Sequence, residues 1–86
     1  MLVLTRPAVR SYLASITIAP ITTNVRGVVT EVEVGPANGL DHPSVVSCDN
    51  VRTIDRAALG PLIGYLAADQ EQILARAIVA AYDLRP

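Results

Sequence analysis

The chain has 86 residues, a net charge of −1 and an apolar content of 51%, and it contains neither Trp nor Phe. A charge this close to zero argues against broad electrostatic binding of duplex nucleic acid. It leaves room for a small RNA site built from a few of the basic residues, all of which are arginines. Arginine favours bidentate phosphate contacts, although a GC-rich coding bias gives the same composition. The length predicts a single domain over residues 1–86 with a small core.

The number of cysteines and the length of the apolar runs indicate the cellular compartment in which the protein is expected. Cys48 is the only cysteine, so neither an internal disulfide nor a cysteine-based metal cluster can form within one chain. The sequence opens without a signal-peptide pattern, and no apolar run reaches the roughly 18 residues of a membrane span. We therefore expect a cytoplasmic protein with no metal and no cofactor.

Short β-branched runs separated by turn residues predict several short strands. We expect strands over residues 1–5, 15–22, 29–34, 44–50 and 62–66, with a loop over residues 6–14 and a turn-rich segment over 35–43. Pro20 indicates an edge or a bulge in the second strand, because proline cannot donate to a sheet ladder. The alternation of residues 29–34 places Glu31 and Glu33 on a solvated face.

The period changes in "DQEQILARAIVAAYDL", residues 69–84, which predicts a C-terminal helix. Its apolar stripe comprises Ile73, Leu74, Ala77, Ile78, Ala81 and Tyr82. Asp69 and Gln72 are candidates for a capping box. The opposite face carries side chains that we expect to be solvated: Asp69, Glu71, Gln72 and Arg76. Several strands followed by one helix predict a mainly β fold, a small twisted antiparallel barrel with the helix packed on it.

The stretch "APITTNVRG", residues 19–27, ends an apolar strand in two hydroxyls, an amide and a guanidinium. Hydroxyl, amide and guanidinium groups can all donate to a phosphate, and a β-branched threonine is held stiffly. This pattern favours a phosphate-binding site at Thr22, Thr23, Asn24 and Arg26. From spacing alone, a polar hairpin end explains the same residues.

A second polar cluster follows the strand over residues 44–50, and it comprises Asp49, Asn50, Arg52 and Asp55. Asp49 is placed to orient an arginine or to act as a base. Asp and Asn also close turns through their own side chains, so a simple turn accounts for the cluster as well. His42 is the only histidine, which excludes a two-histidine ribonuclease site within one chain.

Several segments, in order, resemble the MazF/PemK toxins of bacterial toxin–antitoxin pairs, in particular the mycobacterial MazF branch. They are "LVLT" with Arg6, "IAPITTNVRGVVTEVEV", "SVVSCDNVRTID" and "LGPLIGYL" before a C-terminal helix. The resemblance implies an SH3-like barrel and a homodimer that cleaves single-stranded mRNA at short sequences without a metal or other cofactor. The products end in a 2′,3′-cyclic phosphate and a 5′-hydroxyl, and growth is inhibited. The implied partners are a MazE-like antitoxin and, only together with it, operator DNA.

The resemblance also assigns residues. Thr22 matches the family's catalytic threonine, and Asp49, in "CDN", matches an assisting acid of the PemK-like branch. Ser47 stands where that branch can carry a second arginine. The residues that would contact RNA or the antitoxin are Thr23, Asn24, Arg26, Asn50 and Arg52.

The family pattern opens with a strand, a loop and an Arg-Pro pair before "VLV", whereas this sequence begins at "MLVLT". The catalytic arginine then has no counterpart, and its role is not assigned to Arg6 or Arg10, which lie beyond the strand. We therefore expect an N-terminally truncated toxin domain with its first strand missing and its activity impaired. Met1 matches a family Val, which suggests a gene start assigned at an internal GTG codon. An upstream in-frame stop would contradict that hypothesis.

Two other functions fit the resemblance. A catalytically dead relic that still binds antitoxin would co-purify with antitoxin and leave RNA intact. A CcdB-like gyrase poison, which shares the implied fold, would inhibit supercoiling without cutting RNA. The match at "APITT" favours RNA over gyrase.

Overall fold

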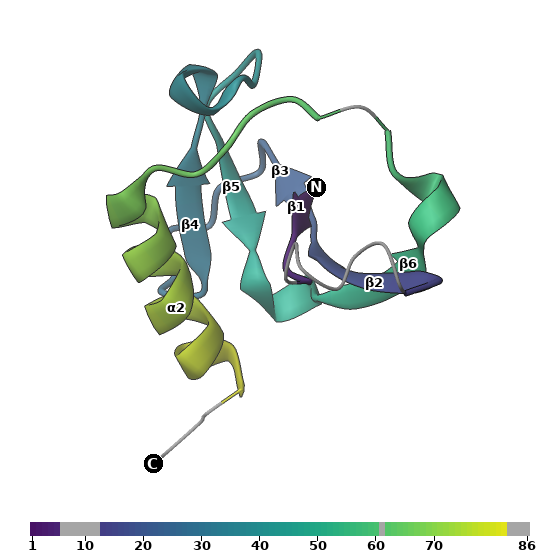
Figure 1. Cartoon of the computed structure of the whole chain (residues 1–86). Helices are drawn as coiled ribbons and strands as arrows, with labels where there is room; N and C mark the ends of the chain where they lie inside the picture. The colour runs from purple at the N-terminus through teal and green to yellow at the C-terminus, as the bar shows by residue number, and fades with distance from the viewer. Residues whose placement is uncertain (6–12, 61, 83–86) are drawn as a thin grey trace.

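The computed structural model describes residues 1–5, 13–60 and 62–82, and within them the chain forms two three-stranded antiparallel sheets and a long helix (Figure 1). The strands are β1 (Leu2–Val3), β2 (Ser15–Ala19), β3 (Ile21–Thr22), β4 (Glu31–Val34), β5 (Ser44–Ser47) and β6 (Arg52–Asp55), and the helix is α2 (Ala68–Tyr82). Single 3-10 turns are η1 (Pro36–Asn38), η2 (Cys48–Asn50) and η3 (Arg56–Ala58). The prediction of a mainly β fold with a C-terminal helix is confirmed. No helix in the described part of the chain is long and apolar enough to cross a bilayer.

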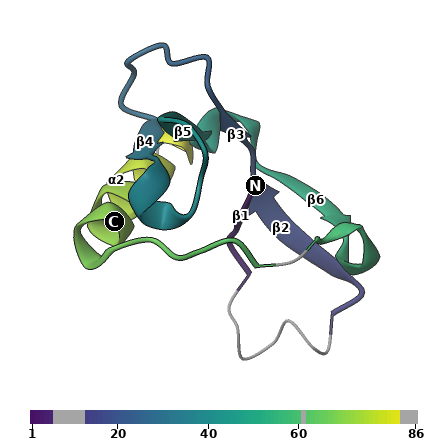
Figure 2. The ribbon, with the colours of Figure 1, turned by 90° about the horizontal axis from the view of Figure 1, so that it is seen from above.

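The chain passes from one sheet to the other at Pro20. The predicted strand over residues 15–22 is two strands: β2 pairs with β1 and β6, and β3 pairs with β5. Pro20 has no N–H to donate, but its carbonyl accepts from the Ser47 N–H at 2.9 Å. Viewed from above, β1, β2 and β6 lie on one side of the molecule, and β4, β5 and α2 on the other (Figure 2). Pro20 is therefore a corner between sheets.

The core lies around the sheet of order β3-β5-β4. All four residues of β5 are buried, because this central strand is covered on both faces. The fully or nearly buried members of this core are Ala19, Val32, Val34, Val46, Cys48 and Ala77. The predicted strand over residues 44–50 ends early, since residues 48–50 turn into η2.

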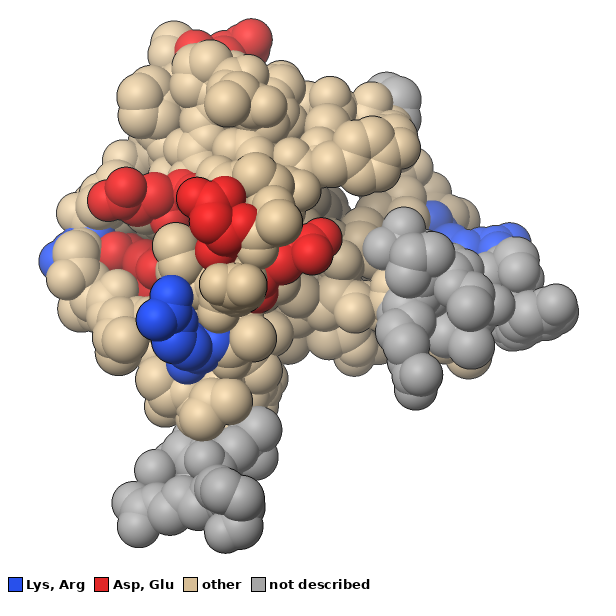
Figure 3. Space-filling model, turned by 60° about the vertical axis from the view of Figure 1, so that its left-hand side comes forward, with Lys and Arg blue, Asp and Glu red and all other residues tan. Residues whose placement is uncertain are grey.

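Helix α2 packs along β4 through a narrower stripe than predicted. Ala77 is buried and Leu74, Ile78 and Ala81 are partly buried against the core, but Ile73 and Tyr82 are 39% and 54% exposed. The opposite face is exposed as expected, and acidic and basic side chains gather on this side of the molecule (Figure 3).

The predicted capping box of α2 is wrong. The helix begins at Ala68, so Asp69 and Gln72 are each two residues too far along the chain to form a capping box. Gln70 instead accepts from the Ala67 N–H at 2.8 Å, which is the reach-back half of a capping box. The Gln70 amide also donates to the Glu33 carbonyl at 3.1 Å and so ties the start of the helix to β4.

One predicted strand is wrong, and one strand was not predicted. Residues 52–55, to which the sequence pattern assigned no element, form β6 and pair with β2 in the register Ser15↔Asp55. Residues 62–66, expected as a strand, have no strand partner and cross over η1. A side chain at Gly64 would collide with the Asn38 carbonyl, so this crossing requires glycine. The loop predicted over residues 6–14 falls largely outside the described residues.

Candidate functional site

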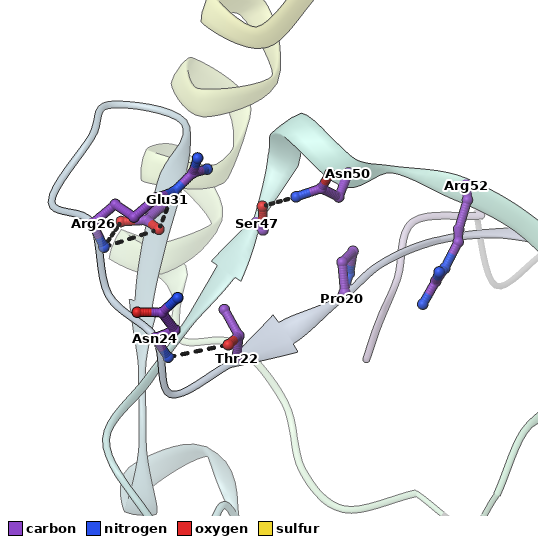
Figure 4. A pocket seen from close by; sticks show the side chains of 8 residues that line it. All are labelled: Pro20, Thr22, Asn24, Arg26, Glu31, Ser47, Asn50 and Arg52. Atoms are coloured by element: carbon purple, nitrogen blue, oxygen red, sulfur yellow. Dashed lines mark hydrogen bonds and ion pairs between the residues drawn. The ribbon is translucent and has the colours of Figure 1, made fainter.

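A cavity of about 430 Å³ lies where the ends of both sheets meet (Figure 4). It is lined by Pro20, Thr22, Asn24, Arg26, Glu31, Ser47, Asn50 and Arg52. The corner at Pro20 and the pairing of β3, β5 and β4 bring these residues together from distant parts of the sequence. We call this cavity the polar pocket.

The polar pocket collects most of the residues predicted from the sequence. Thr22, Asn24, Arg26, Asn50 and Arg52 line it. Thr23 is exposed outside the lining, and Asp49 stands beside the pocket and contacts it through Arg26. From the sequence alone, neither Pro20 nor Glu31 was placed in such a site, and Ser47 was named only as the position where the PemK-like branch can carry a second arginine.

Thr22 presents its hydroxyl at the end of β3. The strand is fixed there by pairing of Thr22 with Val45. Thr22 Oγ1 accepts a hydrogen bond from the Asn24 N–H at 3.1 Å, so the hydroxyl proton is available to donate to another group. The Thr22 side chain lines the polar pocket next to Asn24 (Figure 4).

Glu31 is buried, although it shares a strand face with exposed Glu33, which corrects the prediction that this residue is solvated. β4 begins at Glu31, and residues 26–28, here called the 26–28 turn, fold back over its carboxylate. Glu31 Oε1 accepts from the N–H groups of Arg26 at 3.0 Å, Gly27 at 2.8 Å and Val28 at 3.4 Å. Gly27 has a φ of +73°, a conformation that glycine adopts at little cost.

The electrostatics of Glu31 follow from these contacts. Burial alone would raise the pKa of the carboxyl group. The N–H groups of Gly27, Arg26 and Val28 and the charge of the Arg26 guanidinium favour the ionised form, and the net result is a pKa below the ordinary value of 4.5. Glu31 is therefore a buried carboxylate that stays charged at neutral pH.

Arg26 lies between two carboxylates. Its Nε is 3.6 Å from Glu31 Oε2 and one terminal nitrogen is 3.5 Å from Asp49 Oδ2. Asp49 Oδ2 also accepts from the Thr30 hydroxyl at 2.5 Å, which holds the carboxylate in place. Both ion-pair distances exceed the 2.7–3.2 Å of a well-formed N–H···O bond, so the guanidinium is oriented but keeps donors for a ligand.

The far side of the pocket is built from β5, η2 and β6. Ser47 Oγ accepts from the Asn50 amide at 2.8 Å and fixes that side chain. Arg52 lies opposite Ile18 on β6, is exposed, and has no ion-pair partner among the described residues. Figure 4 shows Arg26 and Arg52 on opposite sides, with Thr22 and Ser47 between them.

Residues 1–82 match the family described as PemK-like, MazF-like toxin of type II toxin–antitoxin systems. The chain belongs to this family. The endoribonuclease MazF3 of Mycobacterium tuberculosis is 58% identical over 84 residues, which is 98% of this chain and 82% of that relative. The family resemblance read from the sequence is thereby confirmed.

Solved structures give the same result for the fold. The Mycobacterium tuberculosis toxin MazF-mt6 superposes with a TM-score of 0.95 at 58% identity, over 99% of this chain and 86% of that one. A mycobacterial endoribonuclease in complex with its cognate antitoxin superposes with a TM-score of 0.84 at 24% identity, over 98% of this chain and 80% of that one. The second comparison shows the shared MazF/PemK fold only.

Other reactive side chains of this MazF/PemK chain lie away from the polar pocket lining. Burial, and the neighbouring charge of Asp49, raise the pKa of the Cys48 thiol, which makes it a poor nucleophile. His42 is exposed in the turn-rich loop and does not line the pocket. Within the described residues no group of three His, Cys, Asp or Glu side chains is placed to hold a metal ion.

Proposed function

We propose that this MazF/PemK toxin is an endoribonuclease that cuts single-stranded mRNA in the polar pocket. The observation that carries the proposal is the Thr22 hydroxyl, held at a strand end between two arginines with its proton available to donate. Hydroxyl and guanidinium donors around one cavity suit a phosphodiester whose negative charge grows during reaction. The homology to an endoribonuclease supports the same assignment.

The proposed reaction is an internal transfer within the RNA. The 2′-oxygen forms a bond to the adjacent phosphorus, and the bond from phosphorus to the 5′-oxygen breaks. The proton lost by the 2′-hydroxyl is balanced by the proton gained at the 5′-oxygen, so the products are a 2′,3′-cyclic phosphate and a 5′-hydroxyl. Thr22 donates to a non-bridging phosphate oxygen, and Arg26 and Arg52 stabilise its charge.

We assign the remaining pocket residues by their contacts. Asp49 is a positioning residue, because its Oδ2 is held by Thr30 and pairs with Arg26. Asn24 and Asn50 offer amide groups suited to reading unstacked bases or binding the antitoxin. Thr23, exposed next to the pocket, would contact the same ligands.

The family assignment sets the biological context of the proposal. A type II toxin has a protein antitoxin as its partner, and a MazE-like chain that occupies this pocket would exclude RNA from it. We propose a homodimer, with operator DNA bound only in complex with the antitoxin. We also propose a cytoplasmic location, since mRNA is there and the single cysteine suits a reducing compartment.

The test is cleavage of a long single-stranded RNA by the purified chain, with product ends identified. We expect discrete cuts ending in cyclic phosphate, and a loss of about 100- to 1,000-fold in Thr22→Ala, the effect of removing one donor to a developing oxyanion. Thr22→Ser keeps the hydroxyl and should retain activity. Thr53→Ala removes an exposed hydroxyl from β6 outside the pocket and serves as the matched control.

The alternative functions give different results. Intact RNA with a folded, antitoxin-binding wild-type chain would show an inactive binding protein and overturn the proposal. Inhibition of DNA supercoiling without RNA cleavage would indicate a gyrase poison. Equal cleavage by wild type and Thr22→Ala would place the reaction elsewhere.

A further inference from the structure

The structure assigns Glu31 as a positioning residue that holds Arg26 over the polar pocket. This inference rests on the proposed function, because it takes Arg26 to contact RNA there. It adds a residue that does not itself touch the substrate: the Glu31 side chain is 4% exposed, whereas that of Arg26 is 54% exposed. The buried Glu31 carboxylate thus pairs with a guanidinium that is exposed to ligands.

The Glu31 carboxylate contacts both the backbone and the side chain of Arg26. Oε1 accepts from the backbone N–H at 3.0 Å, and Oε2 lies 3.6 Å from the side-chain Nε. The Glu31 backbone N–H donates to the Val28 carbonyl at 3.1 Å, so main chain and side chain of one residue both hold the 26–28 turn. A loop held in this way has fewer arrangements in which Arg26 can point away from the pocket.

This arrangement reverses the effect expected from charge alone. A carboxylate that lines an RNA pocket should repel phosphate, and its neutralisation should strengthen binding. Here the carboxylate is buried beneath the turn and its charge is matched by three N–H groups and a guanidinium. An oriented charged donor binds a phosphate with less loss of side-chain entropy than a mobile one. Neutralising Glu31 should therefore weaken RNA binding.

The experiment compares E31Q with E33Q in the full chain. Glu33 lies two residues along the same strand, is exposed, and is not part of the polar pocket, so both changes remove one negative charge. The probe is a single-stranded RNA of mixed sequence with 2′-fluoro groups in place of the hydroxyls, which binds without being cut. Affinity is measured by fluorescence anisotropy over a range of salt concentrations.

We expect E31Q to bind this RNA about tenfold more weakly, the effect of losing one oriented charge-assisted contact. The slope of log affinity against log salt should become shallower by about 0.7, as expected when one phosphate contact to a single strand is lost. E33Q should bind as tightly as wild type or slightly more tightly. Equal or tighter binding by E31Q, with an unchanged slope, would overturn the inference.

A second background separates positioning from general loss of structure. In R26A, the further change E31Q should alter affinity by less than about twofold, because the residue it positions is already gone. A tenfold loss in both backgrounds would show a structural role only and overturn the inference. If wild type neither binds nor cuts RNA, the proposed function fails, whereas failure of E31Q to differ from E33Q leaves that function intact.

If E31Q does not fold, hydrogen exchange in the wild-type protein tests the inference. The backbone N–H groups of Arg26 and Gly27 should then exchange with solvent slowly, because both donate hydrogen bonds to the Glu31 carboxylate. The exposed Val25 N–H is the reference. Exchange of all three groups at equal rates would overturn the inference.

Discussion

The two arginines of the polar pocket differ in what holds them. Arg26 lies between the carboxylates of Glu31 and Asp49 on a loop that folds back over buried Glu31. Arg52 extends from β6, and no carboxylate pairs with it among the described residues. Both can reach a ligand in the same cavity. We infer that Arg26 is oriented before a ligand binds, whereas Arg52 would be ordered by the ligand.

This difference has an energetic consequence. Ordering a free arginine side chain costs up to about 2 kcal/mol, which offsets much of the roughly 1.5–3 kcal/mol that a charged hydrogen bond contributes. Arg26 has lost much of that freedom in the unbound protein. Two residues of the same type in one pocket should therefore contribute unequally to RNA binding and cleavage.

Replacing each arginine with alanine should give the largest difference in kcat/KM between the two positions. R26A should reduce kcat/KM for RNA cleavage about tenfold or more, and R52A about threefold, because only Arg26 is ordered in advance. Both variants should fold, since Glu31 keeps its three backbone N–H donors when the guanidinium is removed. Cleavage rates on one RNA, with circular dichroism as the folding control, make the measurement. An equal loss in both variants would remove the distinction between the two residues.

The sequence predicts the fold best where the apolar pattern is local. The helical spacing around Leu74 and Ala77 identifies α2 to within a residue or two, because the apolar residues from Leu74 to Ala81 recur on one face that packs on the core. Strand pairing is harder to predict from the sequence than this helix. Residues 52–55 are a short and mostly polar run, and their pairing with β2, far away in sequence, makes them a strand.

The candidate site shows the same limit. Thr22, Asn24 and Arg26 stand together in one segment, so their pattern and the family resemblance point to them directly. Glu31 does not, since alternation along β4 assigns it to the solvent side. Its burial depends on a loop folding back over the start of the strand, which no local period encodes. Ser47 enters the pocket through its pairing with Glu31 in the sheet.

Replacing Arg26 or Arg52 with lysine should change kcat/KM less than replacing it with alanine, and it tests the same difference between the two residues. Lysine keeps the charge but has no Nε–H and no planar fork, so in R26K it cannot face Glu31 and Asp49 and still present donors to RNA. We expect a loss of about threefold to fivefold in kcat/KM for R26K and less than about twofold for R52K. The same cleavage assay measures both. A larger loss in R52K would show that Arg52 makes the bidentate contact.

Acidification protonates Glu31 and so removes one of the two carboxylates that pair with Arg26, without any substitution. The pKa of Glu31 in the folded protein lies below its ordinary value of 4.5, so the unfolded chain takes up this proton first as pH falls. The stability that Glu31 contributes is then fully present above pH 4.5 and is lost as pH falls through the lower, folded-state pKa. The wild-type Tm should therefore show no Glu31-dependent change near neutral pH.

Thermal melts of wild type, E31Q and E33Q from neutral to acidic pH test this. Below pH 4.5, the wild-type Tm should fall toward that of E31Q, and slow exchange of the Gly27 N–H should be lost over the same range. E33Q should follow the wild-type curve, because its exposed carboxylate holds no part of the 26–28 turn. Parallel curves for wild type and E31Q would mean that the ionised Glu31 carboxylate does not stabilise the turn. Arg26 would then be held by Asp49 alone, and the comparison with Arg52 would rest on that one ion pair.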